Sequence, residues 1–65
     1  MLKYEYTVRI NNYIVNQGKT SSKQAAMSAF KGFGRGSYGN IVETLDDGST
    51  TEIGHKAIGK SLYCW

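Results

Sequence analysis

Strict alternation of apolar and polar side chains marks the beginning of the chain. The apolar or aromatic positions of this stretch are Tyr4, Tyr6, Val8 and Ile10. A period of two is typical of a β-strand with one buried face. Two asparagines follow at positions 11 and 12, and asparagine tolerates the positive φ angles of a two-residue hairpin turn. We therefore predict a β-hairpin that turns at Asn11-Asn12.

The turn also predicts the register of this hairpin. The pairs expected on the buried face are Ile10 with Tyr13, Val8 with Val15, and Tyr6 with Gln17. The opposite face would then carry Thr7, Arg9, Ile14 and Asn16.

A helical pattern replaces the alternation after Gly18. Ser21 and Gln24 have the spacing of a capping box, which satisfies free amide groups at a helix start. We predict a helix over residues 22–31, with Gly32 as the residue that ends it. Its apolar stripe would consist of Ala25, Ala26, Ala29, Phe30 and Phe33.

A second hairpin is predicted over residues 40–55. A two-residue turn at Asp47-Gly48 would place Glu43 opposite Glu52, and like charges in that position repel. A three-residue loop with a left-handed Gly48 avoids this contact. Its register pairs Leu45 with Ser49 and Ile41 with Ile53, and it buries Ile41, Leu45 and Ile53. Residues 57–65 are expected to close the core as a short strand or turn.

Together these elements predict one domain over residues 1–65, of the α+β class. The expected architecture is a small two-layer sandwich, ββαββ, with an antiparallel sheet and one helix packed on one face. A chain of 65 residues buries only a small core. The single cysteine, Cys64, cannot form an internal disulfide, and one histidine with one cysteine cannot complete a zinc site. Dimerisation or docking on a partner would then add stability.

The chain lacks an apolar run near 20 residues and a signal sequence. A lone cysteine suits a reducing compartment. We expect a soluble cytoplasmic protein that does not associate with membranes and needs no cofactor or metal. Because the chain begins with Met1 and carries no tag, we also expect the product of a complete small reading frame.

Charge is distributed unevenly along the sequence. No acidic residue occurs between Glu5 and Glu43, whereas residues 43–52 carry four carboxylates and no Lys or Arg. A field of one sign attracts phosphates or acidic protein surfaces. The cations of the acid-free interval are Arg9, Lys19, Lys23, Lys31 and Arg35. We expect the last four to form one surface on the helix and its flanking loops, with Arg9 separate on the outer sheet face.

A glycine-rich segment follows the predicted helix. Its Gly34-x-Gly36-x-x-Gly39 spacing is that of a dinucleotide-binding loop, but here the helix precedes the loop, which excludes that site. Residues 31–34, KGFG, with Tyr38 resemble the RNP1 signature of RRM domains and the KGFG of cold-shock domains. This resemblance implies base stacking on exposed aromatics such as Tyr38. The alternative is that Phe33 packs in the core and the glycines only end the helix.

Residues 6–33 resemble the later half of a double-stranded-RNA-binding domain. They share its hairpin, its glycine-basic turn and its alanine-rich helix with a basic start. The resemblance implies that Lys19 and Lys23 grip phosphates. The alternative is an amphipathic helix with solvated lysines.

The layout of the chain resembles small phage-borne anti-CRISPR proteins. The shared features lie in residues 39–65, with Gly59-Lys60 and the terminal Trp65. This resemblance implies a protein without enzymatic activity that blocks a nucleic-acid site on a host complex.

No catalytic constellation is evident. His55 is the only imidazole, Asp46-Asp47 suits a turn, and Cys64 has no activating neighbour in sequence. The leading hypothesis is therefore a phage-type inhibitor that docks its basic surface on a host nucleic-acid-handling or defence complex. The first alternative is a regulator that binds nucleic acid directly. The second is a structural or oligomeric accessory protein, a homodimer for example, with an interface of Ile14, Tyr63 and Trp65. We expect the acidic hairpin to offset the field rather than to mimic phosphates.

Overall fold

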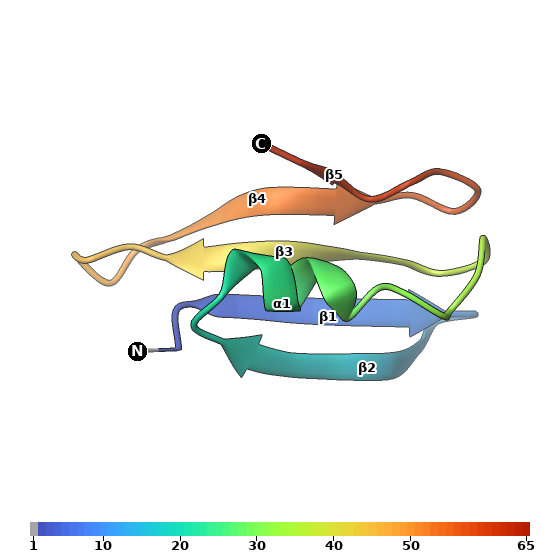
Figure 1. The fold of residues 1–65 in the computed structure, drawn as a ribbon, viewed down its shortest axis with the longest axis horizontal. Helices are drawn as coiled ribbons and strands as arrows, with labels where there is room; N and C mark the ends of the chain where they lie inside the picture. Colours follow the sequence, from blue (N-terminus) through green and yellow to red (C-terminus); the bar gives the residue numbers. More distant parts are fainter. Residues whose placement is uncertain (1) are drawn as a thin grey trace.

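The computed structural model describes residues 2–65, which form one antiparallel sheet and one short helix (Figure 1). The strands are β1 (Tyr4–Ile10), β2 (Tyr13–Thr20), β3 (Tyr38–Thr44), β4 (Thr50–Lys56) and β5 (Tyr63–Cys64), and the helix is α1 (Lys23–Ser28). Their order in the sheet is β2-β1-β3-β4-β5, and each neighbouring pair is antiparallel. The helix lies across one face of the sheet, over β1 and its neighbours (Figure 1).

The prediction of an α+β two-layer sandwich is wrong. The molecule is mainly a five-stranded antiparallel sheet, and its six-residue helix is too short to form a second layer. The helix ends early because Phe30 and Lys31 donate to carbonyls three residues back, which tightens the chain into turns before Gly32 reverses it at φ +87°. The chain order ββαββ is as predicted, and the tail contributes β5 as a further strand.

The first hairpin confirms its predicted turn but not its register. Asn11 and Asn12 have φ angles of 52° and 69°, and Ile10 pairs with Tyr13. A bulge next to Val8 then shifts the pairing by one residue. The observed pairs are Val8 with Asn16 and Tyr6 with Gly18, so the predicted pairs with Val15 and Gln17 are wrong.

Two long-range contacts explain this shift. Asn16 faces the helix, where its Nδ2 donates to the carbonyl oxygen of Ala29 at 3.1 Å. The ring of Tyr6 occupies the space beside Gly18, where an added Cβ would come within 2.6 Å of the Tyr6 hydroxyl. The bulge therefore turns Asn16 inward, where its side chain satisfies a carbonyl at the end of the helix. It also places Gly18 where the ring of Tyr6 needs room, and it leaves Val15 exposed.

The second hairpin has the predicted three-residue loop. The amide of Leu45 donates to the Ser49 carbonyl at 2.7 Å, and Gly48 is left-handed at φ +88°. A bulge after Ile41 pairs that residue with Gly54, so the predicted pair with Ile53 is off by one. The prediction that Leu45 is buried is also wrong, since its side chain is 42% exposed.

The core lies between the sheet and the helix. Its buried apolar members are Val8, Ala26, Phe30, Ile41 and Ile53, and Tyr4, Tyr6, Phe33, Leu62 and Cys64 pack against them. Leu62 and Cys64 confirm that the tail closes the core. Phe33 packs here too, as the alternative to the RNP1-like interpretation of the glycine segment requires. No element within residues 2–65 covers the opposite face of the sheet.

Candidate functional site

The uncovered face of the sheet, here called the outer face, carries a row of side chains across all five strands. Alternation places Thr7 on this face, because its neighbour Val8 is fully buried on the other. Residues paired between strands share a face. The row that follows from the register is Gln17, Thr7, Asn40, His55 and Tyr63.

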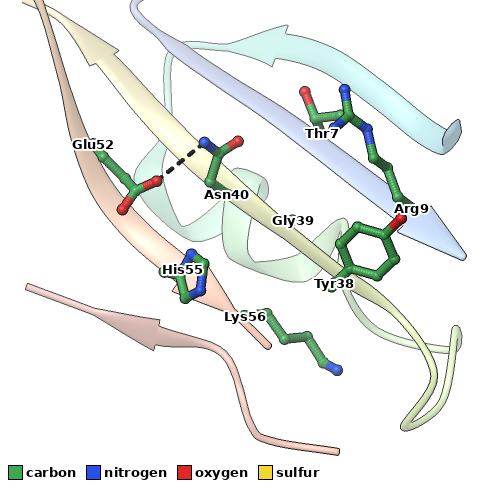
Figure 2. A pocket seen from close by; sticks show the side chains of 8 residues that line it. All are labelled: Thr7, Arg9, Tyr38, Gly39, Asn40, Glu52, His55 and Lys56. Atoms are coloured by element: carbon green, nitrogen blue, oxygen red, sulfur yellow. Dashed lines mark hydrogen bonds between the residues drawn. The ribbon is translucent and has the colours of Figure 1, made fainter. Parts of the chain in front are cut away.

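A shallow concavity of about 290 Å³, the outer hollow, lies on this face. Figure 2 shows the side chains that line it, with the helix behind the strands. The lining residues are Thr7, Arg9, Tyr38, Gly39, Asn40, Glu52, His55 and Lys56. They come from β1, β3 and β4, so the register of three strands determines the site.

Tyr38 is held in place by the turn of the first hairpin. Its hydroxyl donates to Oδ1 of Asn12 at 3.0 Å and accepts from the Asn12 amide at 3.1 Å. Arg9 is the cross-strand partner of Tyr38, and its guanidinium extends along the same face toward Thr7 (Figure 2). Aromatic and guanidinium groups together suit a ligand with a flat ring and an anionic group.

Asn40 and Glu52 form the polar floor of the outer hollow. Nδ2 of Asn40 donates to Oε2 of Glu52 at 3.1 Å (Figure 2). This bond orients the amide and leaves Oδ1 of Asn40 and Oε1 of Glu52 as further acceptors. The pair can therefore accept hydrogen bonds from a ligand that carries N–H groups.

Lys56 ties the sheet to the loop that follows the helix. Only 8% of this residue is exposed, and its Nζ donates to the Ser37 carbonyl at 2.6 Å. Ser37 is itself buried and donates from Oγ to the Gly34 carbonyl at 2.8 Å. A buried ammonium group needs such a partner, because burial without one carries a large desolvation cost.

A second link brings two exposed cations together. The amide of Gly59 donates to the carbonyl of Arg35 at 2.8 Å, which places Lys60 next to Arg35. Lys31 lies earlier in the same loop. We call the exposed cations Lys31, Arg35 and Lys60 the basic end. The segments 31–37 and 56–62 contain no Asp or Glu.

The carboxylates gather at the other end of the sheet. The β3–β4 turn carries Asp46 and Asp47, and Glu43 forms an ion pair with Lys3 at 3.3 Å. The molecule is 34 Å long, and Figure 1 shows this turn at one end and the two cationic segments at the other. The uneven charge of the sequence thus becomes a separation of charge along the long axis.

Ser49 lowers the pKa of Asp47 at the acidic turn. Its hydroxyl and then its amide are the main causes, with donor–acceptor distances of 2.6 Å and 2.9 Å to the Asp47 carboxylate. Both donors stabilise the charged form of the carboxyl.

The predicted four-cation surface is divided in this structure. Lys31 and Arg35 lie in the loop after the helix, whereas Lys19 and Lys23 lie where β2 ends and α1 begins, at the other end of the helix from that loop (Figure 1). Lys19 belongs to β2 rather than to a connection and pairs across strands with Glu5. Lys23 begins the helix, and its Nζ lies 3.5 Å from the carbonyl oxygen of Trp65.

Arg9 lies apart from these lysines, on the outer face, as predicted. Tyr38, the aromatic candidate, lies beside it in the outer hollow.

Sequence reasoning missed most of the outer hollow. In the predicted register Asn40 would pair with Gly54, and the bulge after Ile41 brings His55 to that place. Lys60 was missed as a member of the basic end because it follows the acidic hairpin in sequence. Its proximity to Arg35 depends on one backbone hydrogen bond between distant segments.

Within residues 2–65, no group of three or more His, Cys, Asp or Glu side chains could hold a metal ion. None of the helices in this range is long and apolar enough to cross a membrane. No protein-family model matches the chain, and neither a curated protein nor a solved structure matches it.

Proposed function

We propose that this chain is a small binding protein without enzymatic activity, an inhibitor of the phage type. It would dock its basic end on an acidic or phosphate-bearing surface of a host nucleic-acid-handling or defence complex. One observation supports this function: the basic end holds exposed cations in two acid-free segments, while the acidic turn lies at the far end of a 34 Å molecule. The setting of this function would be the cytoplasm of the host cell.

The arrangement suits docking for a physical reason. Exposed cations without neighbouring carboxylates keep their field, which steers association with an anionic partner and raises its rate. At about 0.15 M salt the field decays over roughly 8 Å, so the acidic turn does not cancel it. The Arg35 carbonyl accepts from the Gly59 amide, and the Ser37 carbonyl accepts from Nζ of Lys56. These two hydrogen bonds hold the charges on an ordered loop and reduce the entropy lost on binding.

Capture of the partner tests this function. Tagged protein would be incubated with a nuclease-treated bacterial lysate, and bound proteins identified by mass spectrometry. Lys31→Gln combined with Arg35→Gln should abolish capture of the partner. Lys19→Gln combined with Lys23→Gln removes the same charge from the other end and serves as the matched control, with capture retained. Equal capture by both variants would contradict an interface at the basic end.

A second assay addresses inhibition itself. The protein would be expressed in bacteria whose CRISPR system restricts a phage, and plaque formation would be counted. An inhibitor raises the plaque count, and the basic-end variant does not. A count unchanged by the wild-type protein would reject that defence complex as the target.

Direct binding of nucleic acid is the second candidate function. The specific observation in its favour is the set of rings on the outer face, where Tyr38 lies beside Arg9 and His55 beside Tyr63. Rings and cations on an open sheet are a known means of holding unpaired bases.

A further inference from the structure

Several exposed aromatic side chains lie close together on the outer face. Tyr63 is 68% exposed and Trp65 is 57% exposed, and their ring centroids lie 5.8 Å apart. Trp65 lies one residue beyond β5, and the contact between its ring and that of Tyr63 extends the row that ends in Tyr63. His55 and Tyr38 add two further rings on the same face. Single exposed apolar residues are common, but a cluster of them on one face marks an interaction surface.

Hydrogen bonds within the protein hold the Tyr38 ring and the backbone of Trp65. Two hydrogen bonds with Asn12 hold the Tyr38 hydroxyl. The amide of Trp65 donates to the Ile53 carbonyl at 2.9 Å, which fixes the end of the chain on β4. Preorganised aromatic groups lose little conformational entropy on binding.

The groups around the rings match the parts of a nucleotide. Arg9 offers a guanidinium on the same face, next to Thr7, and this group is suited to a phosphate (Figure 2). Glu52 and Asn40 offer acceptors to the amino groups of a base. Among the residues that line the hollow, Glu52 carries the one carboxylate, and Glu5 on the same face is the cross-strand neighbour of the cation Lys19. From Asn40 to Tyr63 the row crosses two strand spacings, about 10 Å in all.

We propose that the outer face binds a single-stranded nucleic acid. Bases stack on the Tyr63–Trp65 pair and on His55, and one nucleotide enters the outer hollow with its phosphate on Arg9. The strand must be unpaired, because a duplex hides the flat faces of its bases within the stack. This site lies on the outer face, next to the basic end, and its proposal does not depend on the inhibitor function.

Fluorescence anisotropy tests this inference. The probes are fluorescein-labelled RNA and DNA strands of about twelve nucleotides, within the size range of single-strand sites, and the corresponding duplexes. The wild-type protein should bind the single strands more tightly than the duplexes at about 0.05 M salt, and more weakly at about 0.2 M. Tyr63→Ala should lower the affinity about 5- to 150-fold, the loss expected for one stacked base.

Tyr13→Ala is the matched control. Tyr13 is a tyrosine of β2 with 75% exposure, away from the aromatic row, and its removal should leave the affinity unchanged. Circular dichroism of both variants establishes that they are folded. Amide chemical-shift changes in the wild-type protein, expected at Asn40, His55 and Tyr63, locate the bound strand independently of any variant.

Three results would overturn the inference. The first is no binding of any single strand at low salt. The second is equal affinity for duplexes, which would assign binding to backbone charge alone. The third is an equal loss in the two tyrosine variants. A preference for RNA or for DNA would support the inference and identify the sugar. None of these results affects partner capture from a nuclease-treated lysate, so failure here is distinct from failure of the inhibitor function.

Discussion

At the scale of single residues, the buried ammonium group of Lys56 joins β4 to the loop after the helix. Its hydrogen bond to the Ser37 carbonyl satisfies both groups away from water. Lys56→Met would fill the same space but leave that carbonyl without a donor. We expect the free energy of unfolding to fall by about 1–3 kcal/mol, measured by urea titration followed by circular dichroism. Lys60→Met, at an exposed site, should change it by less than about 0.5 kcal/mol.

Gly39 is a second position where a single residue determines how closely two strands can pack. A Cβ at Gly39 would overlap the carbonyl oxygen of Thr7 on the neighbouring strand, and φ is +157°. The atoms that this Cβ would meet are backbone atoms of Thr7 and Val8, which cannot move aside as a flexible side chain could, so Gly39→Ala should destabilise the fold by about 3 kcal/mol or more. Gly36→Ala meets open space and serves as the control. Similar thermal unfolding midpoints for the two variants would contradict this role.

At the scale of secondary-structure elements, the stability of the helix depends on the residue that caps its N-terminus. Ser22 is the N-cap, and its Oγ accepts from the Ala25 amide at 3.3 Å, whereas the sequence pattern had indicated Ser21. Ser22→Ala should lower the free energy of unfolding by about 1 kcal/mol, and Ser21→Ala by less than about 0.5 kcal/mol. Urea titrations of the pair distinguish the two caps, and the reverse order would favour Ser21.

The acidic turn gives the hairpin β3–β4 a pH-dependent contribution. The pKa of Asp47 is lowered by Ser49, so the stabilisation is present above the ordinary carboxyl pKa and is lost as pH falls through the lowered value. Ser49→Ala should raise the pKa of Asp47 toward its ordinary value in an NMR titration. An unchanged titration of Asp47 in this variant would show that Ser49 is not the cause.

Local turn chemistry was predictable from the sequence, and strand register was not. Asn11-Asn12, Gly32 and Gly48 adopt the predicted positive φ angles, because these preferences reside in the residues themselves. The bulges depend on contacts between distant segments, such as Asn16 with the helix end and Tyr6 with Gly18. The alternation of apolar and polar residues along the chain carries no information about those contacts. A register shift of one residue was enough to make the outer hollow unpredictable, because the shift places His55 rather than Gly54 opposite Asn40.

At the scale of the whole molecule, the sheet order predicts where the fold opens first. β1 and β3 are paired on both sides, whereas β5 is a two-residue strand at one edge. Amide hydrogen exchange should be slowest in the central strands, at Val8 and Ile41, and fastest in β5 and the helix. Protection of Cys64 equal to that of Ile41 would instead indicate that the sheet unfolds as one unit.

Charge at this scale separates into two regions that act independently. The basic end and the acidic turn lie at opposite ends of a 34 Å molecule, several times the distance over which salt screens a charge. Their formal sum, +3 with neutral histidine, therefore describes neither end. Lys31 and Arg35 of the basic end could be predicted from the sequence because they are close together in the chain. Lys60 could not, because it comes near Arg35 only in the folded structure.

The position of Trp65 has a consequence for spectroscopy. It is the only tryptophan of the chain and is already more than half exposed in the folded state. Its emission should therefore change little in wavelength when the protein unfolds, so a denaturation curve followed at this indole would underestimate the transition. Its contact with Tyr63 places the same fluorophore on the outer face, where a stacked base would quench it. Quenching of this emission by an added single strand would therefore measure the occupancy of that face, which a denaturation curve does not.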